Sequence, residues 1–244
     1  MNLQTVKELT ERKSVRAFTG EKIPSEVKTM ILEAAVNAPS AGCQQLYTII
    51  DVTDQELKDK LVGTCDNQPF IAKADVVLIF CADCRKWYEG FQDTGCDPRL
   101  PGVGDLMLAV TDAAIAAQNA VTAAWSLGIG SCYIGDVMEN CEEQKSILKL
   151  PPFVFPAAMV VFGYPTEQQI NREKPMRASL QYIVSENRYP VYTPEDRKEM
   201  LFGNRKNSCE EGYETWMQKF CNRKYNSDFS REMTRSVKEY LKDY

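Results

Sequence analysis

The 244-residue chain has an ordinary globular composition, with 44% hydrophobic residues, 26% charged residues and a net charge of −5. These values exclude a wholly disordered chain and argue against a nucleic-acid partner, because nucleic-acid-binding surfaces are rich in Lys and Arg. The sequence contains no His, which excludes Ser-His-Asp and Cys-His hydrolases and His-ligated metals. It has no leader-like apolar segment at its start and no run of about 18 apolar residues, so we expect a soluble, cytoplasmic protein with no membrane partner.

Near the N-terminus, apolar residues at helical spacing predict two helices, over Leu3–Arg12 and Ser25–Asn37. Where the first helix ends, three cations and a hydroxyl come together: Arg12, Lys13, Arg16 and Ser14. Such a set can bind a phosphate, because guanidinium groups pair with phosphate oxygens and the hydroxyl adds a neutral hydrogen bond. Alternatively, the cations are solvated at a helix end, where the helix dipole favours them.

A run of small and amide residues follows the second helix and precedes a strand predicted over Tyr47–Val52. It contains Pro39, Ser40, Ala41, Cys43 and Gln45. Small residues let backbone N–H groups approach a planar ligand closely, and a Gln side chain can both donate to and accept from the edge of a heterocycle. A plain connection between a helix and a strand has the same composition.

The next helix is predicted from Asp54 to Leu61, and a turn containing Asn67 and Gln68 then leads to an apolar strand over Asp75–Cys81. The segment from Trp87 to Val103 contains Gly and Pro, so we expect an irregular loop. Its aromatic residues either cover a pocket or pack against the body of the protein.

Nine cysteines form an odd set, and without a secretion signal they are more consistent with reduced thiols than with disulfides. Cys81 and Cys84 have the spacing of a redox or metal-binding pair, and Cys96 is the nearest third thiol. No second pair of this kind and no His completes a tetrahedral set, so we expect no metal site. A redox role for the pair is left open.

The longest predicted helix runs from Leu106 to Leu127, with Asp105 as its expected N-cap. Alanine residues on several of its faces predict burial on most sides, which suits either the central helix of a monomer or a helix at a subunit interface. The small and apolar run Leu127–Gly135 then predicts a buried strand and a turn. A helix over Glu142–Leu148 and a strand over Phe153–Phe162 complete a layered α/β-type domain.

A basic run, Arg172–Arg177, follows this domain and by itself would be a solvated loop. Pro190 and Pro194 mark a linker, and helical patterns cover Ser208–Cys221 and Ser230–Leu241. We therefore expect one domain over 1–190 and a C-terminal helical extension over 191–244 that packs on the core or on a partner subunit. A solvated terminal helix is the alternative.

Together these segments resemble the FMN-dependent nitroreductase family, over roughly Leu3 to Arg188. In that family an R-x-S-x-R-x-F-type segment binds the FMN phosphate, and Arg12, Ser14 and Arg16 match this pattern. The resemblance therefore implies that the basic segment binds phosphate.

A second motif of the family, a P-S-x-x-N-x-Q-P-type loop, lines the ribityl chain and the isoalloxazine ring. Pro39, Ser40 and Gln45 match it. Cys43 stands where the family usually has Asn, and Leu46 where Pro is frequent, so the contacts from this loop are less specified than those from the basic segment.

A third motif is the family's G-L-G-S-C-W-I-G strand and turn, which Leu127–Gly135 resembles. The resemblance implies that backbone amides of Ile134 and Gly135 face N5 of the flavin, where fixed dipoles can tune hydride chemistry without a titratable side chain. In the family an Asn or Gln before the second strand contacts the flavin edge, which points to Asn67 or Gln68. Late basic residues return to the phosphate, which points to Arg177 and Lys174.

The resemblance implies an α+β, nitroreductase-like fold: a central, mostly antiparallel sheet flanked by helices, in an intertwined homodimer with FMN at the interface. No side chain is predicted as a catalytic acid or base. The candidate cofactor-binding residues are Arg12, Lys13, Ser14, Arg16, Pro39, Ser40, Ala41, Cys43, Gln45, Asn67, Gln68, Cys132, Tyr133, Ile134, Gly135, Lys174 and Arg177.

The implied activity is that of an FMN oxidoreductase, which takes hydride from NADH or NADPH and reduces a nitroaromatic, quinone or related electrophile by a ping-pong mechanism. The chain has no Rossmann dinucleotide fingerprint, and the resemblance requires none. Two alternatives stay open. One is a non-catalytic flavin-binding or sensor protein, and the other is a variant family chemistry such as reductive dehalogenation or flavin destruction.

Overall fold

The computed structural model describes residues 3–205 and 210–244 of the chain. They form two compact units, one of Met1–Arg172 with Glu232–Tyr244 and one of Glu173–Arg231. These bounds differ from the predicted 1–190 and 191–244, because the last residues of the chain pack in the first unit. The predicted domain division, with an extension that packs on the core or on a partner subunit, stays a prediction.

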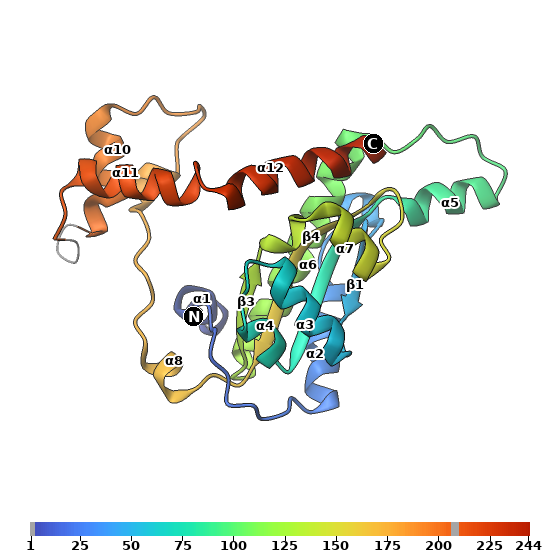
Figure 1. The fold of residues 1–244 in the computed structure, drawn as a ribbon, viewed down its shortest axis with the longest axis horizontal. Coiled ribbons are helices and arrows are strands. Elements are labelled where there is room, and N and C mark those ends of the chain that lie inside the picture. Colours follow the sequence, from blue (N-terminus) through green and yellow to red (C-terminus); the bar gives the residue numbers. More distant parts are fainter. Residues whose placement is uncertain (1–2, 206–209) are drawn as a thin grey trace. The chain divides into compact units, whose positions relative to one another are not determined.

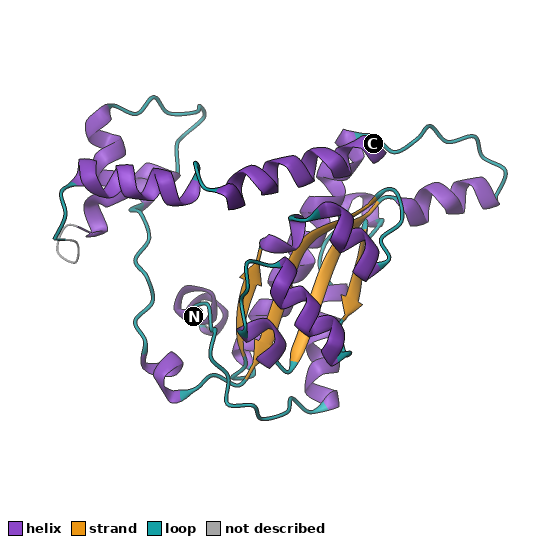
Figure 2. Cartoon of the chain, in the orientation of Figure 1, coloured by secondary structure: helices purple, strands orange, loops and turns teal. Residues whose placement is uncertain are grey.

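Within the described residues, the first unit contains one four-stranded sheet in the order β1–β2–β4–β3, and every strand pair is antiparallel (Figure 2). In the register of the sheet, Ile49 lies opposite Phe80 and Leu78 lies opposite Val160. The strands are β1 (Tyr47–Asp51), β2 (Val76–Asp83), β3 (Gly130–Ile134) and β4 (Val154–Gly163). The predicted α+β fold with a mostly antiparallel sheet is therefore confirmed.

Helices cover both faces of this sheet (Figure 1). Those of the first unit are α1 (Gln4–Glu11), α2 (Ser25–Val36), α3 (Gln55–Thr64), α4 (Phe70–Lys73), α5 (Arg85–Asp93), α6 (Val103–Ser126), α7 (Cys141–Leu148) and α8 (Glu167–Asn171), with the short 3-10 turns η1 (Ala41–Cys43), η2 (Asp136–Met138) and η4 (Leu241–Asp243). The helix α12 (Asp228–Tyr240) begins in the second unit and ends in the first.

Strand β2 shows how the layers form, because all of its residues are buried. Val77 and Ile79 point to the face that carries α3, α4 and α7, whereas Leu78 and Phe80 point to the face that carries α2 and α6. A strand that is covered on both faces has a continuous apolar sequence rather than an alternating one. The apolar run in the sequence therefore marks the centre of the sheet.

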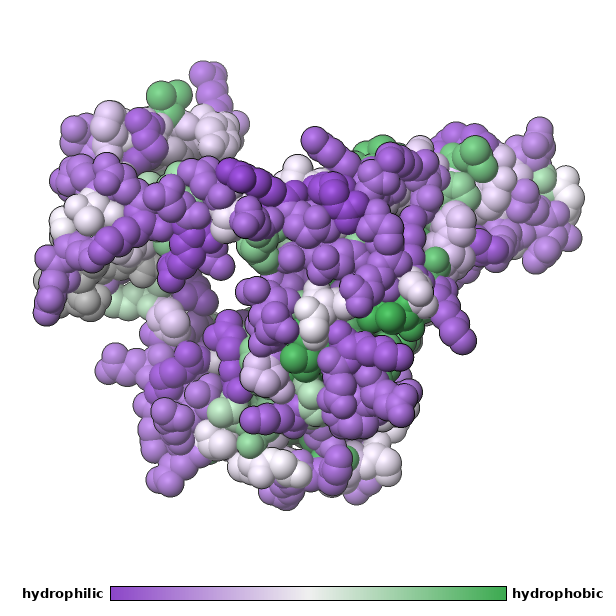
Figure 3. Space-filling model, viewed as in Figure 1, coloured by the Kyte–Doolittle hydropathy of each residue, from purple (hydrophilic) through white to green (hydrophobic). Residues whose placement is uncertain are grey.

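Helix α6 lies in this core and approaches the sheet through alanines, including Ala109, Ala113 and Ala117, all of which are fully buried. Within the described residues it is the one helix that is long and apolar enough to cross a membrane. Its packing against the sheet accounts for the same composition. The surface in Figure 3 is largely hydrophilic, in keeping with the charged content of the chain.

The segment after α1 lies against the edge of β3, where the backbone N–H of Val15 donates to the Ser131 carbonyl at 2.8 Å. This approach requires glycine in the sheet. A Cβ on Gly130 would lie 2.6 Å from Val15 Cγ2, and a Cβ on Gly163 would lie 2.7 Å from Phe18 Cδ1. The two glycines therefore let the N-terminal segment pack onto the sheet.

The prediction of an irregular loop over Trp87–Val103 is wrong in its first part, where α5 is a helix. The carboxylate of Asp83 accepts hydrogen bonds from the N–H groups of Arg85 and Lys86, at 3.0 and 3.2 Å, and so caps the start of α5. The expected N-cap role of Asp105 is also wrong, because α6 already begins at Val103. Asp105 instead accepts the N–H of the N-cap residue Gly102 at 2.8 Å, which is the half of a capping box that the third helical residue supplies.

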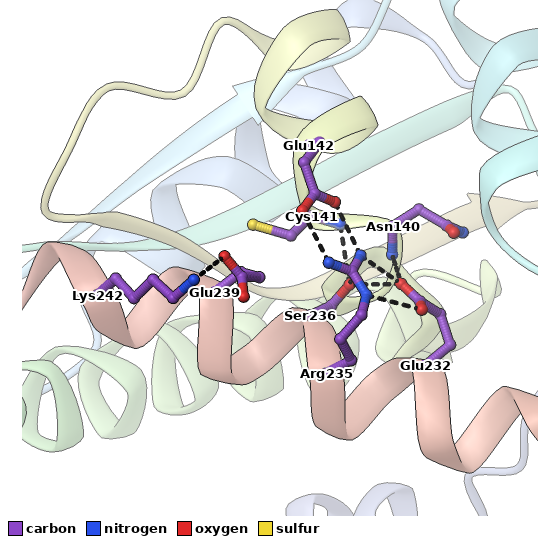
Figure 4. Close-up of polar contacts among 8 residues, drawn as sticks. All are labelled: Asn140, Cys141, Glu142, Glu232, Arg235, Ser236, Glu239 and Lys242. Atoms are coloured by element: carbon purple, nitrogen blue, oxygen red, sulfur yellow. Dashed lines mark hydrogen bonds and ion pairs between the residues drawn. The ribbon is translucent and has the colours of Figure 1, made fainter.

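The last helix, α12, is held on α7 by a set of polar contacts that we term the α12 clamp (Figure 4). Arg235 donates to both carboxylate oxygens of Glu142, at 2.7 and 2.8 Å. The N–H groups of Asn140 and Cys141, at the start of α7, donate to Glu232 Oε1 and Ser236 Oγ. The end of α12 is also anchored by Tyr240, whose buried ring packs edge-on against Phe155 at 5.0 Å.

The second unit is helical, with α9 (Leu180–Ile183), α10 (Pro194–Phe202), η3 (Gly203–Arg205) and α11 (Tyr213–Lys224). The predicted linker is wrong at Pro194, which is the first residue of α10. A proline is tolerated there because the first helical N–H has no partner within the helix. The start of the predicted helix Ser208–Cys221 lies outside the described residues, and the described helix in this region is α11.

Candidate functional site

The basic segment brings three of its predicted residues together beside β3. Burial raises the pKa of the Cys132 thiol, while the Arg16 charge, hydrogen bonds with Ser14 and Arg16 and the Arg12 charge act to lower it. Burial also raises the pKa of Tyr133 to about 12, against an opposing effect of the Arg12 charge. Ser14 forms a β-bridge with Ser131, and the side chains of Arg12, Ser14 and Arg16 act on Cys132, so all three lie beside β3.

The fourth member of the segment has a different environment. Lys13 Nζ donates to the carbonyl of Ile170 at 2.6 Å and to that of Arg172. In return, the Arg172 guanidinium donates to the Ser14 carbonyl, and Gln169 Oε1 accepts the Arg16 N–H at 3.2 Å. These hydrogen bonds hold the basic segment against α8 and Arg172. Lys13 has at most one N–H left for a cofactor. Its cofactor role stays a prediction.

Two guanidinium groups beside this segment keep a donor atom without a partner. Within the described residues, Arg12 Nη1 is buried and has no hydrogen-bond partner, and the same is true of Arg172 Nε. A buried N–H without a partner costs free energy, so a guanidinium in this state favours binding of an oxyanion. Arg172 was missed by the sequence reasoning, although it is the first residue of the basic run Arg172–Arg177.

The loop of small residues takes a conformation that few side chains adopt. Gly42, Cys43 and Gln45 all have positive φ angles, of 56°, 56° and 49°. Ser40 Oγ accepts the N–H of Gln45 at 2.9 Å, and the Gln45 amide donates to the Val36 carbonyl at 2.9 Å. The Gln45 side chain thus ties the loop to the end of α2, and its predicted contact with a flavin ring is not tested by this geometry.

A buried carboxylate holds the same loop from the other side. Asp112 in α6 accepts the N–H of Ala41 at 2.9 Å and the N–H of Leu46 at 3.1 Å, and its exposed fraction is 2%. The sequence reasoning missed this residue. The signal was present, since Asp112 is a single carboxylate in the middle of an alanine-rich apolar helix.

The turn before β2 is tied to the residue that follows the β3 turn. Gln68 Nε2 donates to Asp136 Oδ2 at 2.8 Å and to the Cys65 carbonyl at 3.0 Å. Asp66 and Asn67 have φ angles of 56° and 51°, a left-handed conformation that Asp and Asn tolerate. The structure therefore brings Gln68 close to Ile134–Gly135, whereas the side chain of Asn67 is exposed.

Two hollows flank the loop of small residues. One, with a volume of about 270 Å³, lies between this loop and α5 and includes Gln44, Leu46, Trp87, Tyr88, Phe91 and Leu108 among its lining residues. Trp87 Nε1 donates to the Gln44 carbonyl at 2.8 Å, which fixes the indole at the edge of this pocket. The other hollow is an open groove lined by Pro39, Ser40, Ala41 and one face of α6. The aromatic residues of α5 thus line a pocket, which was one of the two alternatives for them.

The Cys81 and Cys84 pair does not have the environment of a reactive dithiol. Both side chains are buried, and burial raises their pKa values to about 12 and about 11. A thiol that stays protonated at neutral pH is a poor nucleophile and a poor metal ligand. Among the described residues, no group of three or more Cys, Asp or Glu side chains could hold a metal ion.

The two late basic residues lie in the second unit. Arg177 Nη1 donates to the Pro175 carbonyl at 2.9 Å, and the Arg177 carbonyl accepts from Asn204. The assignment of Lys174 and Arg177 to the phosphate stays a prediction.

Comparison with known proteins identifies the family of the chain. Residues 9–164 match the model of the Nitroreductase family. The chain is 30% identical over 240 residues to an FMN reductase (NAD(P)H) of Bacillus subtilis, covering 97% of this chain and 90% of that protein. It is 34% identical over 185 residues to an oxygen-insensitive NADPH nitroreductase of Salmonella typhimurium, covering 76% and 74%. The solved structure of the NfrA1 nitroreductase of B. subtilis superposes with a TM-score of 0.78 at 29% identity, covering 94% and 98%. The chain therefore belongs to the nitroreductase family.

Proposed function

We propose that this chain is an FMN-dependent oxidoreductase that takes hydride from NADH or NADPH and passes electrons to an electrophilic small molecule such as a nitroaromatic or a quinone. The observation that carries the proposal is the convergence of Arg12, Ser14 and Arg16 beside β3, with a buried guanidinium N–H that has no partner in the described chain. Relatives named FMN reductase and NADPH nitroreductase support the same activity.

The residues of the chain bind and orient the cofactor. Arg12, Ser14 and Arg16 supply charge-assisted and neutral hydrogen bonds to the phosphate. Asp112 fixes the loop of small residues, whose backbone can then approach the flavin. The Gln68–Asp136 contact joins the turn over residues 65–68 to the turn after β3, and in this proposal the flavin ring lies at these two turns. When bound, FMN supplies hydride acceptance and electron transfer. The proposal assigns no side chain as a catalytic acid or base.

The acceptor site in this proposal is the pocket beside α5. Trp87, Tyr88 and Phe91 offer apolar ring surfaces, which suit a planar aromatic acceptor of modest size. If the nicotinamide and the acceptor both use this pocket, the nicotinamide must leave before the acceptor enters, which is ping-pong turnover.

We also propose that the enzyme is a soluble, cytoplasmic homodimer with FMN at the subunit interface. The apolar residues Leu3, Val6 and Leu9 lie along α1, and about half of the surface of each is exposed. A contiguous exposed apolar stripe of this kind is typical of an interface. Sedimentation of the purified protein over a range of concentrations measures its oligomeric state.

The activity is tested by anaerobic half-reactions. The FMN-loaded protein is mixed with NADH or NADPH, and the visible flavin absorbance is followed. We expect bleaching with at least one nucleotide and recovery of absorbance on adding a nitroaromatic or a quinone. In steady-state turnover with both substrates, we expect parallel lines in double-reciprocal plots. Bound flavin that bleaches with neither nucleotide would contradict the proposal and favour the non-catalytic flavin-binding alternative.

A further inference from the structure

Glu139 is a buried carboxyl group that follows the turn η2 at the end of β3. Its exposed fraction is 5%, and its Oε1 atom has no hydrogen-bond partner among the described residues. The titratable groups that face it are also acidic: Asp136 on η2, Asp66 on the turn after α3, and Glu232 on α12. The nearby cation of Arg235 is already paired with Glu142 and Glu232.

These surroundings favour the neutral form of Glu139. Burial raises its pKa to about 8, and the charge of Asp136, a hydrogen bond with Asp136 and the charges of Asp66 and Glu232 add to the effect. An ionised carboxylate at this position would be desolvated and would face three like charges. The neutral acid instead has one O–H to donate, and the Asp136 carboxylate is the acceptor within reach.

Asp136 in turn connects two segments of the chain. Its Oδ2 atom accepts from Gln68 Nε2 at 2.8 Å, and Gln68 also donates to the Cys65 carbonyl. Asp136 directly follows the Ile134–Gly135 turn. A carboxylate that accepted from both Glu139 and Gln68 would be fixed on both sides and would hold the two turns together.

We propose that Glu139 is a positioning residue: as a neutral acid it donates a hydrogen bond to Asp136, and this orients the carboxylate that holds Gln68 and the turn over residues 65–68. The link to flavin binding rests on the proposed function, because it is that proposal which places the flavin at these two turns. Ionisation of Glu139 replaces the hydrogen bond by a like-charge contact and loosens the turn.

The first test compares unfolding of the flavin-free full chain and of its E139Q variant across pH. The amide of Gln is a neutral donor at every pH. The native pKa of Glu139 is raised above an unfolded value of about 4.3, so its stabilisation is complete below that pH and is lost as the pH rises to about 8. The unfolding equilibrium constant of the wild type relative to E139Q should therefore rise by up to about tenfold per pH unit within this window and level off above it.

A ratio that stays constant over the window would show that Glu139 is ionised in the native protein and would overturn the proposal. E143Q is the matched control, because Glu143 is exposed on α7, close by in the sequence. The unfolding equilibrium constant of the wild type relative to E143Q should not follow the same pH dependence.

The second test measures hydrogen exchange of the backbone amides in the turn 65–68, corrected for intrinsic exchange. We expect protection in the wild type to fall above about pH 8, protection in E139Q to persist, and E139A to be unprotected at every pH. Equal protection in E139A and E139Q would overturn the positioning role. Both tests use flavin-free protein, so failure to bind FMN would refute the proposed function and leave this inference standing. In protein that binds FMN, E139Q should retain its affinity at high pH where the wild type loses it.

Discussion

Replacement of Asp112 by Ala tests whether a single buried carboxylate fixes the loop of small residues. Asp112 is 2% exposed and accepts the N–H groups of Ala41 and Leu46 at 2.9 and 3.1 Å. Without it, the Leu46 N–H stays buried with no partner, whereas the Ala41 N–H is partly accessible and gains some compensation from water. An unsatisfied buried donor costs about 1–3 kcal/mol, and the partly compensated Ala41 N–H adds less than that, so the total loss is about 1–5 kcal/mol in the free energy of unfolding.

The assay is urea unfolding of the Asp112→Ala and Asp112→Asn variants beside the wild type. The Asn oxygen can still accept one of the two N–H groups, so we expect Asn to lose about half as much as Ala. Thr111→Ala is the control on the same helix, because the Thr111 hydroxyl only donates to the Met107 carbonyl at 2.9 Å on an exposed face. An Asp112→Ala variant within about 0.5 kcal/mol of the wild type would refute the reasoning. A destabilised but folded variant should also bind FMN more weakly, because the loop is no longer fixed.

The packing and the charges lead to four further predictions. Gly130→Ala should destabilise the protein by about 1–3 kcal/mol, because its Cβ would lie 2.6 Å from Val15 Cγ2. The control Gly63→Ala in α3 has open space at its Cβ and should be neutral or stabilising. Thermal unfolding measures both variants. Arg235→Ala should open the α12 clamp and increase proteolysis of residues 232–244, whereas Lys242→Ala, which removes a contact only within the C-terminal segment, should not. Hydrogen bonds from Arg235 lower the pKa values of Glu142 and Glu232 to about 2. The wild-type clamp should therefore be complete above about pH 5 and should weaken as the pH falls toward 2. Proteolysis of residues 232–244 by an acid-active protease that does not change over this range would contradict the assignment. Mass spectrometry after alkylation of the native protein at pH 8 should find Cys43 and Cys96 modified and Cys81 and Cys84 protected, and equal labelling of all four would show that burial does not control their reactivity.

Sequence patterns predicted the elements whose burial is visible in their composition. The continuous apolar run of β2 and the alanine-rich α6 were predicted because packing on several sides leaves a direct compositional signal. Helix α5 was missed because its interior Gly90 and the glycines and prolines that follow it favour a loop. The Asp83 carboxylate, which accepts from N–H groups two and three residues further on, is a local signal for the helix start that was not used. Pro194 was interpreted as a linker residue, although the Thr193 and Asp196 capping box beside it is a sequence signal for a helix start.

The candidate site was predictable at the level of motifs and less so at the level of partners. The pattern Arg12, Ser14 and Arg16 identified a cluster that the structure brings together at Cys132. A sequence pattern cannot tell which cation has a structural role. Lys13 donates to two backbone carbonyls of the chain, which the pattern did not indicate. Glu139 could not have been found from the sequence, because a charged residue in a polar stretch is typical of the surface and only the tertiary structure buries it.

The central claim is that the basic segment anchors a flavin by its phosphate. Titration of flavin-free protein with FMN and with riboflavin, which lacks the phosphate, tests this most directly, in the wild type, in Arg16→Ala and in Lys7→Ala as an exposed control on α1. A charge-assisted phosphate contact contributes about 1.5–3 kcal/mol, so Arg16→Ala should weaken FMN binding by roughly ten- to a hundredfold and leave riboflavin binding unchanged, while Lys7→Ala changes neither. Equal losses for both flavins in Arg16→Ala, or no loss for FMN, would contradict the claim.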